Sequence, residues 1–247
     1  MQIAVFSDIH GNDFAFELVE ADIKKQKVDQ LVCLGDAIQG GPQPAAVVQR
    51  LHELNCPVVM GNADAWLLSG IETGDEGIPP ERLKKMEGIR LWSLSQLSDD
   101  DRAYISSFQP TITIPLEENL SLLCFHGSPT SFDDIILPDA PKEVFQNFLG
   151  AYSDRILTGG HTHAQQIRRT GDWFFFNPGS VGLAYSQFHP DGKTPIDPWA
   201  EYAILTVENG QTSLEFRRLP FDVNQLINIY RASRRPFAED AVAQYQR

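Results

Sequence analysis

The chain has 247 residues, of which 42% are apolar and 21% charged, and its 33 acidic against 20 basic side chains give a net charge of −13. This length supports one large α/β domain, or a core domain with an inserted cap, and the composition is ordinary for a soluble protein. The acidic balance argues against a broad electrostatic grip on nucleic acid or anionic lipid, because such surfaces need clustered Lys and Arg.

The start of the chain and its cysteines indicate a compartment. Met1 leads directly into an apolar run without a leader of the secretory type, and no apolar run approaches membrane-spanning length. Cys33 and Cys124 lie within apolar runs, which indicates buried free thiols rather than disulfides. We therefore expect a cytoplasmic protein without a membrane partner.

The first predicted strand ends in two potential metal ligands. Residues 3–6 are apolar, and Asp8 and His10 follow them, with Gly11 and Asn12 behind. On a regular strand the two side chains would point the same way, and the glycine would let the backbone turn sharply. A carboxylate and an imidazole at the carboxyl end of a strand indicate a metal site. A strand end followed by a helix that Asn12 caps explains the same residues without a metal.

Two further β-α units follow the same pattern. The periodicity predicts a helix over 13–27, a strand over 31–34, a helix over 44–54, a strand over 56–60 and a mainly helical segment over 65–108. Asp36 follows the second strand after a glycine, and Asn62 follows the third in the same way. These units deliver both side chains to the edge that holds Asp8. A helix cap at Asp36 and a turn at Asn62 are the alternatives without a metal.

The second half of the chain is richer in strands. The pattern predicts strands over 111–115, 120–125, 155–158, 166–169, 173–176, 202–207 and 212–219, and helices over 142–149, 221–234 and 237–246. His126 follows the second of these strands, and His161 and His163 follow the third behind two glycines. A hydrogen-bonded core histidine is the alternative for His126. His52 lies on a predicted helix away from any strand end, so we expect a surface or packing role for it.

The coincidence of these residues at strand ends outweighs the separate alternatives. The predicted ligands are Asp8, His10, Asp36, Asn62, His126, His161 and His163. Imidazole, carboxylate and amide oxygen suit divalent ions such as Mn, Fe, Zn or Ni, and the lack of a cysteine cluster disfavours a structural zinc site. Seven ligands are too many for one tetrahedral ion and about right for two ions that share a bridging carboxylate.

The order of these motifs resembles that of the calcineurin-like metallophosphoesterases, in particular their small bacterial and archaeal phosphodiesterase-like branch. The motifs are Asp8-x-His10, Gly35-Asp36, Gly61-Asn62-x-Asp64, His126-Gly127, Gly160-His161-Thr162-His163 and Asn177-Pro178-Gly179-Ser180. The resemblance covers about residues 1–220 as one domain, with a helical insertion at about 65–108, and leaves 221–247 as a C-terminal helical extension. It implies an α/β fold of four layers, an α-β-β-α sandwich of two mixed sheets flanked by helices.

The resemblance also implies two divalent metal ions as cofactors. By matched motif, Asp8, His10 and His163 bind the first ion, Asn62, His126 and His161 bind the second, and Asp36 bridges them. The implied activity is hydrolysis of phosphodiesters or activated phosphomonoesters, in which hydroxide bridging the two ions attacks phosphorus in line with the leaving group. The implied catalytic residues are Asp8, His10, Asp36, Asn62 and His126. The substrate is then a small phosphoester, and the oligomeric state stays open, a homo-oligomer included.

Two other functions are weighed against hydrolysis of a small phosphoester. The retromer scaffold subunit has this fold and uses its surface for partners, so a non-catalytic scaffold for protein–protein interaction is the alternative. All seven ligand positions are filled here, which favours an enzyme. A nuclease of the same superfamily would need a basic groove, which the acidic balance disfavours.

Two departures from the family pattern narrow the expected chemistry. Most relatives have a histidine in place of Ala63 that contacts phosphate or helps protonate the leaving oxygen, so we expect a preference for leaving groups that need little protonation, such as aryl groups. We expect Asp64 to cap the next helix and His189 to face solvent rather than to supply that proton. Residues 37–40 replace the Asp-Arg clamp of the protein serine/threonine phosphatases, which argues against that activity. We expect Asn177 to shape the pocket floor.

Overall fold

Two β-sheets and the helices around them make up the described part of the chain. The computed structural model describes residues 1–71, 79–117, 120–152, 156–170, 173–185 and 195–245. The strands are β1 (Gln2–Phe6), β2 (Gln30–Cys33), β3 (Ile112–Glu117), β4 (Leu120–Cys124), β5 (Ile156–Thr158), β6 (Gln166–Thr170), β7 (Trp173–Asn177), β8 (Trp199–Glu208) and β9 (Gln211–Pro220). The helices are α1 (Asp13–Gln26), α2 (Pro44–Glu53), α3 (Asn62–Ser69), α4 (Pro80–Ser95), α5 (Asp99–Ser106), α6 (Lys142–Leu149), α7 (Val223–Ala232) and α8 (Ala238–Ala243), with a 3₁₀ turn at Gly150–Tyr152.

Both sheets are mixed. The first has the order β2-β1-β8-β9, in which β1 is parallel to β2 and antiparallel to β8. The second has the order β3-β4-β5-β7-β6, in which β4, β5 and β7 run parallel and the two outer strands run antiparallel. Because parallel strands end at the same edge, the carboxyl ends of β1 and β2 lie together, as do those of β4 and β5.

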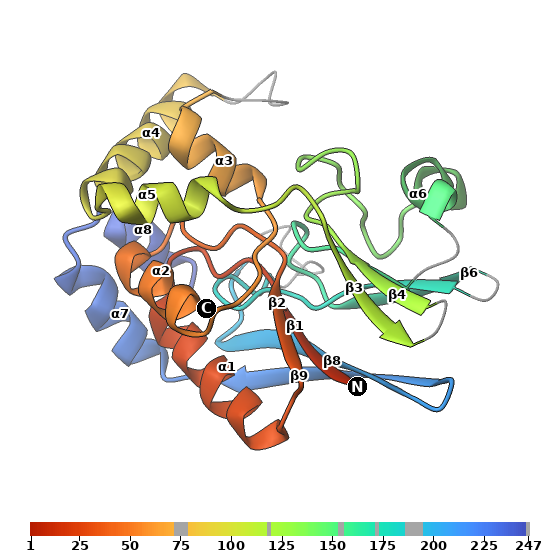
Figure 1. The fold of residues 1–247 in the computed structure, drawn as a ribbon. Helices are drawn as coiled ribbons and strands as arrows, with labels where there is room; N and C mark the ends of the chain where they lie inside the picture. The colour runs from red at the N-terminus through yellow and green to blue at the C-terminus, as the bar shows by residue number, and fades with distance from the viewer. Residues whose placement is uncertain (72–78, 118–119, 153–155, 171–172, 186–194, 246–247) are drawn as a thin grey trace.

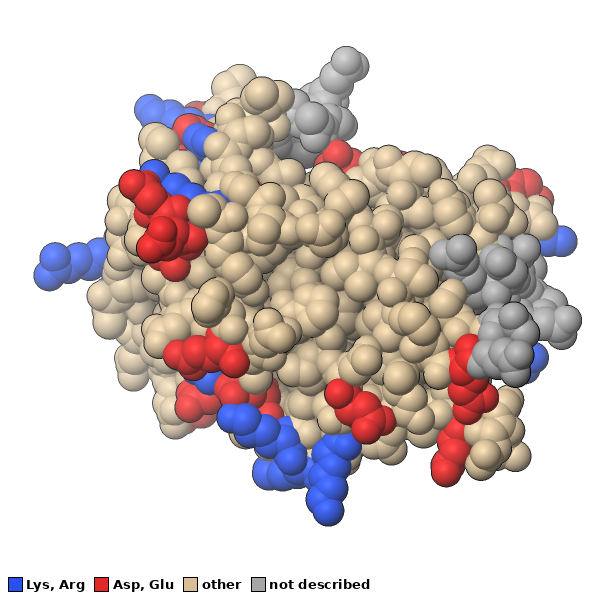
Figure 2. All heavy atoms as spheres, in the orientation of Figure 1, with Lys and Arg blue, Asp and Glu red and all other residues tan. Residues whose placement is uncertain are grey.

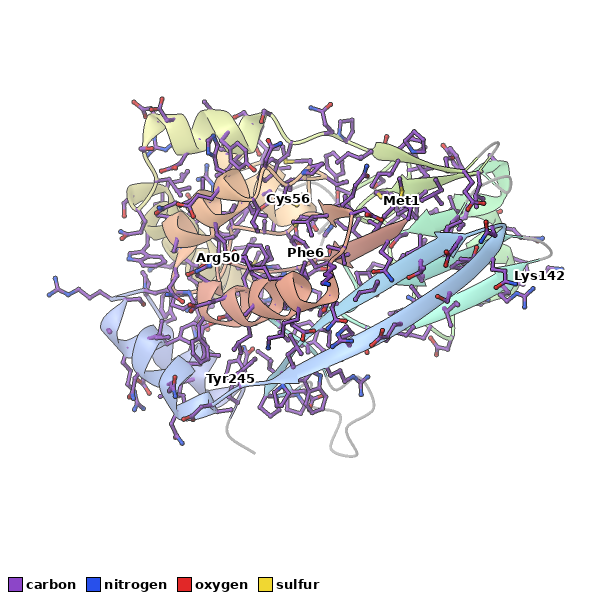
Figure 3. The ribbon with its side chains drawn as sticks, turned by 60° about the horizontal axis from the view of Figure 1, so that its bottom comes forward. Met1, Phe6, Arg50, Cys56, Lys142 and Tyr245 are labelled. Carbon is purple, nitrogen blue, oxygen red and sulfur yellow. The ribbon has the colours of Figure 1, made fainter. Side chains whose placement is uncertain are left out.

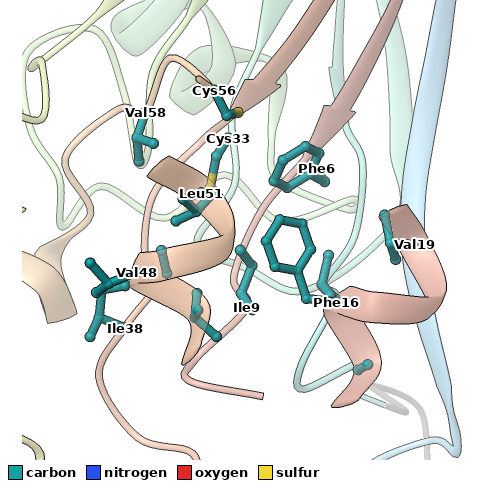
Figure 4. Close-up of a cluster of buried hydrophobic side chains, with 14 of the residues drawn as sticks. Phe6, Ile9, Phe16, Val19, Cys33, Ile38, Val48, Leu51, Cys56 and Val58 are labelled. Atoms are coloured by element: carbon teal, nitrogen blue, oxygen red, sulfur yellow. The ribbon is translucent and has the colours of Figure 1, made fainter. Parts of the chain in front are cut away.

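Side chains on β1 alternate between two buried clusters. Ile3 and Val5 point into a cluster shared with β4, β5 and β7 of the second sheet. Ala4 and Phe6 point the other way, into a cluster shared with α1 and α2, where the rings of Phe6 and Phe16 lie 5.2 Å apart (Figure 4). One face of the first sheet therefore packs on helices and the other on the second sheet.

The second sheet is covered in the same way on its outer face. Leu122 and Cys124 of β4 belong to the cluster between the sheets, whereas Leu123 of β4 and the following Phe125 pack with Phe145 of α6. Figure 1 shows α6 on the far side of the second sheet from α1 and α2. The order of layers is helix, sheet, sheet, helix, so the predicted four-layer α/β sandwich is confirmed.

The C-terminal helices α7 and α8 have a small core of their own. Leu226 and Tyr230 of α7 pack against Val242 of α8, with Tyr245 and Ile196 completing the cluster. The pair lies beside α1 and α2 in Figure 1. Helices were predicted for this part of the sequence, and the structure has them.

The strand predicted over 56–60 is wrong. In the structure Val58 makes a single bridge to Cys33 and Val59 makes one to Gln109. β2 ends at Cys33, so residues 56–60 lie beside only the last residue of β2. The two segments therefore form one bridge and not a ladder of hydrogen bonds. The helix that follows begins at Asn62, earlier than the predicted 65.

Local capping interactions and a first-turn proline mark the starts of three helices. The Asn12 side chain accepts a hydrogen bond from Ala15 N at 3.1 Å, and Pro44 occupies the first turn of α2. Ser98 and Asp101 form a reciprocal capping box at the start of α5. These local signals position α1 and α2 against the first sheet.

The cysteines and the surface agree with the composition. Cys33, Cys56 and Cys124 are free and buried, as predicted for Cys33 and Cys124. Figure 2 shows small groups of Lys and Arg near groups of Asp and Glu at the rim of one face, around a mainly uncharged middle. Among the described helices, none has both the length and the apolar character that crossing a bilayer requires.

Candidate metal centre

The ends of four strands bring the predicted ligands to one rim. Backbone pairing continues past β1 and β2, where His10 N donates to Asp36 O at 2.9 Å. In the second sheet, Gly160 N donates to His126 O at 2.9 Å, beyond the ends of β5 and β4. These bonds align the segments that carry the ligands, although the segments lie far apart in the sequence.

The ligand-bearing segments leave the regular strand conformation. Left-handed backbone, with φ between +48° and +69°, occurs at Asp8, His10, Asp36, His161 and His163. The regular strand on which Asp8 and His10 would point the same way is not present, because β1 ends at Phe6. Side chains other than glycine rarely adopt this conformation, and such strain gathers at functional sites.

The structure brings all seven predicted ligands together in two groups. The first ligand group is Asp8, His10 and His163, and the second is Asp36, His126 and His161. Within each group the ligand atoms all lie within 4.8 Å of one another. Asn62 joins the second group, with Oδ1 3.0 Å from His126 Nε2.

Asp36 lies between the two groups. Its Oδ2 is 3.8 Å from His10 Nε2 in the first group and 3.4 Å from His126 Nε2 in the second. Its Oδ1 accepts a hydrogen bond from Ala63 N at 2.8 Å, which fixes the carboxylate. One oxygen thus faces both groups, which is the position that a bridging ligand needs.

Backbone carbonyls orient three of the imidazoles. His10 Nδ1 lies 2.8 Å from Gln39 O, His126 Nδ1 lies 2.8 Å from Leu34 O, and His163 Nδ1 lies 2.7 Å from Leu183 O. Because a carbonyl only accepts, Nδ1 is the donor in each pair, and Nε2 of the neutral ring is left with a lone pair. Histidines that bind metals have this arrangement, since the outer hydrogen bond fixes the tautomer and the ring.

The polar atoms inside the site lack partners that a cation would supply. His10 Nε2 and His163 Nε2 face each other at 3.1 Å, and the lone pairs of two neutral rings repel at that distance. Asp8 Oδ2 accepts from His161 N at 3.1 Å, whereas buried Asp8 Oδ1 lies 3.3 Å from His163 Nε2 and is left without a partner when that ring is neutral. An unpaired buried carboxylate oxygen is costly. The donor set therefore fits divalent cations.

Charge coupling keeps both carboxylates ionised at neutral pH. Burial raises the pKa of Asp36, but the imidazoles of His126, His10 and His161 together lower it by more, so the pKa lies well below its usual range. Burial lowers the pKa of His126, and the Asp36 carboxylate raises it to about 9 when no cation is bound. Burial also raises the pKa of Asp8 and lowers that of His163. The interaction between these two residues acts the other way, and the net shift is downward for Asp8 and upward for His163. A bound divalent cation would favour the neutral rings instead.

Two motif glycines are required by close approach. A Cβ at Gly160 would lie 2.0 Å from Ser7 Oγ and 2.9 Å from Asp8 Oδ2. A Cβ at Gly61 would lie 2.2 Å from Asp36 Oδ1. Any side chain at either position would displace a predicted ligand.

The last motif braces the site from below. Asn177 Nδ2 donates to Gly160 O at 2.6 Å and to Thr162 Oγ1 at 3.1 Å, so it holds the turn that carries two histidines. Ser180 Oγ donates to Asp8 O at 2.8 Å. Asn177 is buried, which agrees with the expected floor role.

The expected helix cap at Asp64 is wrong. Gly61 is the N-cap residue of α3, and the first-turn Ala63 N donates to the Asp36 carboxylate rather than to Asp64. The buried Asp64 carboxylate instead accepts hydrogen bonds from Ala37 N and Ile38 N, each at 3.0 Å. Burial and the charge of Asp36 raise the pKa of Asp64 to about 7. Asp64 therefore braces the turn that follows Asp36.

Two of the remaining predictions have clear outcomes. His52 is exposed, with its ring edge-on to Tyr104 at 5.3 Å, as expected for a packing role. Ala63 lies in the first turn of α3 and has no side-chain proton to donate. His189 lies outside the described residues.

Sequence reasoning missed the groups behind the ligands. The carbonyls that orient the imidazoles leave no trace in the sequence, because every residue has one. Tyr185 stacks on His163 with ring centroids 4.5 Å apart and planes 8° from parallel. It follows the Asn177 motif closely, but a single tyrosine in a loop is not a usable signal.

The candidate metal centre lies apart from a cavity elsewhere in the molecule. A cavity of about 520 Å³ lies between the end of α1 and the start of β2, lined by residues such as Phe16, Lys27 and Leu54. None of the predicted ligands lines it. The converging ligand atoms, rather than cavity size, therefore identify the site.

The fold and the site agree with one known family. The chain matches the model of the calcineurin-like phosphoesterase superfamily domain over residues 1–210. The chain therefore belongs to the calcineurin-like phosphoesterase superfamily.

Individual relatives are distant. The uncharacterized protein MJ0912 of Methanocaldococcus jannaschii is 28% identical over 201 residues, which are 73% of this chain and 76% of that protein. Phosphodiesterase YfcE of Escherichia coli is 26% identical over 215 residues, 83% of this chain and 87% of that enzyme.

Two solved structures share the fold. The hypothetical protein PH1004 of Pyrococcus horikoshii superposes with a TM-score of 0.81 at 19% identity, covering 99% of this chain and 97% of that one. A metallophosphoesterase of Sphaerobacter thermophilus superposes with a TM-score of 0.73 at 23% identity, covering 99% and 98%.

Proposed function

We propose that the protein is a dinuclear metal-dependent phosphoesterase that hydrolyses small phosphodiesters or activated phosphomonoesters. Membership of the phosphoesterase superfamily supports this class of reaction. The single observation behind the dinuclear assignment is the position of Asp36 Oδ2, which lies between one imidazole of each ligand group. YfcE, a distant relative, is named a phosphodiesterase.

The proposed roles of the residues follow from their surroundings. Asp8, His10 and His163 would hold one ion, Asn62, His126 and His161 the other, and Asp36 both. When bound, two divalent cations supply a water of lowered pKa and neutralise the oxygens of the phosphoryl group. The carbonyls behind the imidazoles keep the Nε2 lone pairs turned inward, and burial keeps bulk water from competing for the carboxylates.

In the described part of the chain, Asp8 and Asp36 form ion pairs with histidines and with no Lys or Arg. Ala63 has no proton to give to a leaving oxygen. We therefore infer a preference for substrates whose leaving group is stable as an anion, such as an aryl oxide.

A cytoplasmic location of the protein stays a prediction.

The test measures metal content and hydrolysis together. Purified protein should bind two equivalents of Mn²⁺ and should hydrolyse bis(p-nitrophenyl) phosphate, or p-nitrophenyl phosphate, only with the metal. Asp36→Asn should lower kcat/KM by more than about 100-fold, because losing a shared ligand affects both ions. Asp100→Asn, at an exposed carboxylate in the first turn of α5, is the matched control and should leave both measurements unchanged.

The alternative function predicts a different result. A non-catalytic scaffold of this fold would be inert on both substrates even when fully loaded with metal. That outcome would contradict the proposed activity.

A further inference from the structure

The α7–α8 pair reaches the two loops that orient the imidazoles of the first ligand group. These helices follow β9 and have their own apolar cluster, so they form a distinct element on the side of the molecule that holds α1 and α2. Their hydrogen bonds to the rest of the chain are few, and two of them end on peptide units beside the carbonyls behind His10 and His163.

The first contact comes from the connection between α7 and α8. Arg235 Nε donates to Gly40 O at 2.5 Å. Gly40 follows Gln39, whose carbonyl accepts from His10 Nδ1. The guanidinium is held by two more carbonyls of its own segment and lies over the ring of Tyr230, 5.7 Å from its centroid. Its hydrogen bonds are to carbonyl groups, so it holds the backbone rather than a carboxylate.

The second contact comes from the end of α8. Tyr245 Oη donates to Gly182 O at 3.2 Å, and Tyr245 is buried. Gly182 precedes Leu183, whose carbonyl accepts from His163 Nδ1 at 2.7 Å. Gly182 N in turn donates to Asp8 O at 3.0 Å. Gly182 and Leu183 therefore link Tyr245, just after α8, to two residues of the first ligand group.

The space between these two contacts is not filled by side chains. A cavity of about 220 Å³ lies there, bounded by Gly40, Leu183 and Tyr185 on the site side and by Arg235, Phe237 and Gln244 on the helix side. Because side chains do not fill this cavity, the positions of the two loops depend more strongly on the hydrogen bonds from Arg235 and Tyr245.

Among the described residues, the support of His126 in the second ligand group does not involve α7 or α8. His126 is oriented by Leu34 O, and Leu34 N donates to Phe6 O at 2.9 Å within the first sheet. Leu34 is completely buried in the core between the sheets. The support of this group lies inside the sandwich, whereas the support of the first group lies partly in α7 and α8.

We propose that the α7–α8 pair is a positioning element for the metal ion of the first ligand group, with Arg235 and Tyr245 as the positioning residues. The inference rests on the proposed function, because it assumes that both groups bind metal. Changes to groups behind a metal ligand weaken metal binding by about 10–100-fold. Arg235 and Tyr245 act one peptide further out, so we expect the lower end of that range.

The test is a titration of the metal-free full-length chain with Mn²⁺, followed by calorimetry or by the electron paramagnetic resonance signal of free Mn²⁺. Variants His163→Ala and His161→Ala assign the two binding steps, since each removes a ligand of one group. Tyr245→Phe removes one hydroxyl, and Arg235→Met removes the guanidinium. Each should weaken the step of the first group by roughly tenfold and leave the other step unchanged. Arg235→Lys should restore it, because an ammonium group still donates.

The control variant breaks a contact within the same helical pair. Arg231→Met removes the exposed ion pair with Glu239, which touches neither loop, and should leave both steps as in the wild type. Equal weakening of both steps, or an unchanged first-group step in the double variant Arg235→Met/Tyr245→Phe, would overturn the inference. A wild-type chain that binds no Mn²⁺ would overturn the proposed function as well, whereas two unperturbed steps with normal hydrolysis would overturn the positioning role alone.

Discussion

At Gly160, the addition of a single methyl group should disturb the first ligand group. A methyl group there would lie 2.9 Å from Asp8 Oδ2 and closer still to Ser7 Oγ. We predict that Gly160→Ala weakens Mn²⁺ binding at the first group and lowers the free energy of unfolding by about 1–3 kcal/mol, the usual cost of overpacking. Titration with Mn²⁺ and urea unfolding measure the two effects.

Gly150→Ala is the matched control for this change. The added Cβ would come no closer than 4.0 Å to Gln146 Cβ. It should leave both measurements unchanged, and wild-type behaviour of Gly160→Ala would show that the predicted crowding is absorbed by movement of Ser7.

Ala63 is the residue that limits leaving-group chemistry in the proposed mechanism. It lies in the first turn of α3 and is held beside Asp36 by its own N–H. We predict that Ala63→His raises kcat/KM for alkyl phosphodiesters by roughly tenfold or more and has little effect on bis(p-nitrophenyl) phosphate, because a general acid helps poor leaving groups most. Ala63→Phe has similar bulk without a proton, and an equal gain in that variant would contradict the acid role.

The identities of the predicted ligands, but not their conformations, could be found from the sequence. Asp8 and Asp36 follow two parallel strands of one sheet, whose carboxyl ends lie at the same edge, so their convergence was predictable. His126 follows β4 of the second sheet, and its meeting with them was predicted from the whole series of motifs. The left-handed backbone of Asp8 and Asp36 was not predictable, because it arises from contacts with neighbouring segments rather than from local preference. The use of Asp64 to brace residues 37–38 was missed for the same reason, since local capping chemistry competes with a tertiary contact.

At the scale of elements, an ion-pair network joins α1 to α2. Arg50 of α2 is labelled in Figure 3. It makes two bonds to the Asp13 carboxylate, at 2.7 and 3.0 Å, and a third to Glu20, and both acidic residues are on α1. We predict that Arg50→Met lowers the free energy of unfolding by about 2 kcal/mol at pH 7, a value typical of charge-assisted hydrogen bonds that are partly screened by solvent. Urea unfolding gives the value.

The loss of unfolding free energy in Arg50→Met should depend on pH. Burial raises the pKa of Glu20, but hydrogen bonds from Lys24 and Arg50 lower it by more, so the net shift from 4.5 is downward. A carboxyl group with a lowered folded-state pKa contributes stability above its unfolded pKa that is lost as pH falls through the folded value. The cost of Arg50→Met should therefore shrink below about pH 4. Lys24→Met, which removes a largely exposed partner of the same carboxylate, should cost less than about 0.5 kcal/mol.

The prediction of elements succeeded where periodicity was long and failed where pairing was short. α1 and the β8–β9 hairpin have clear patterns and a clear cap or turn, and both form as expected. Residues 56–60 have the apolar composition of a strand, but strand formation depends on the length of the partner, and the partner ends at Cys33. Composition alone cannot report where a neighbouring strand stops.

At the scale of the whole molecule, bound metal should add to stability. Ions that bind only the folded chain stabilise it by about 2.7 kcal/mol per site at 100 times Kd. For a chain of this size that corresponds to a rise in Tm of roughly 5–10 °C per site. We predict that Mn²⁺ raises the Tm and that a chelator reverses the change, as measured by calorimetry. A Tm that stays the same after addition of Mn²⁺ and of the chelator would contradict a metal site of useful affinity.

Neither ligand group belongs to one sheet. Asp8 and His10 follow β1 while His163 follows β5, and Asp36 follows β2 while His126 and His161 follow β4 and β5. Cations at these positions would cross-link two layers that otherwise pack through apolar side chains and hydrogen bonds such as His126 Nδ1 to Leu34 O. Amide protons next to the site, at 125–127 and 158–160, should then exchange with deuterium faster once the cations are stripped, while those in the distal half of the β8–β9 ribbon keep their rate.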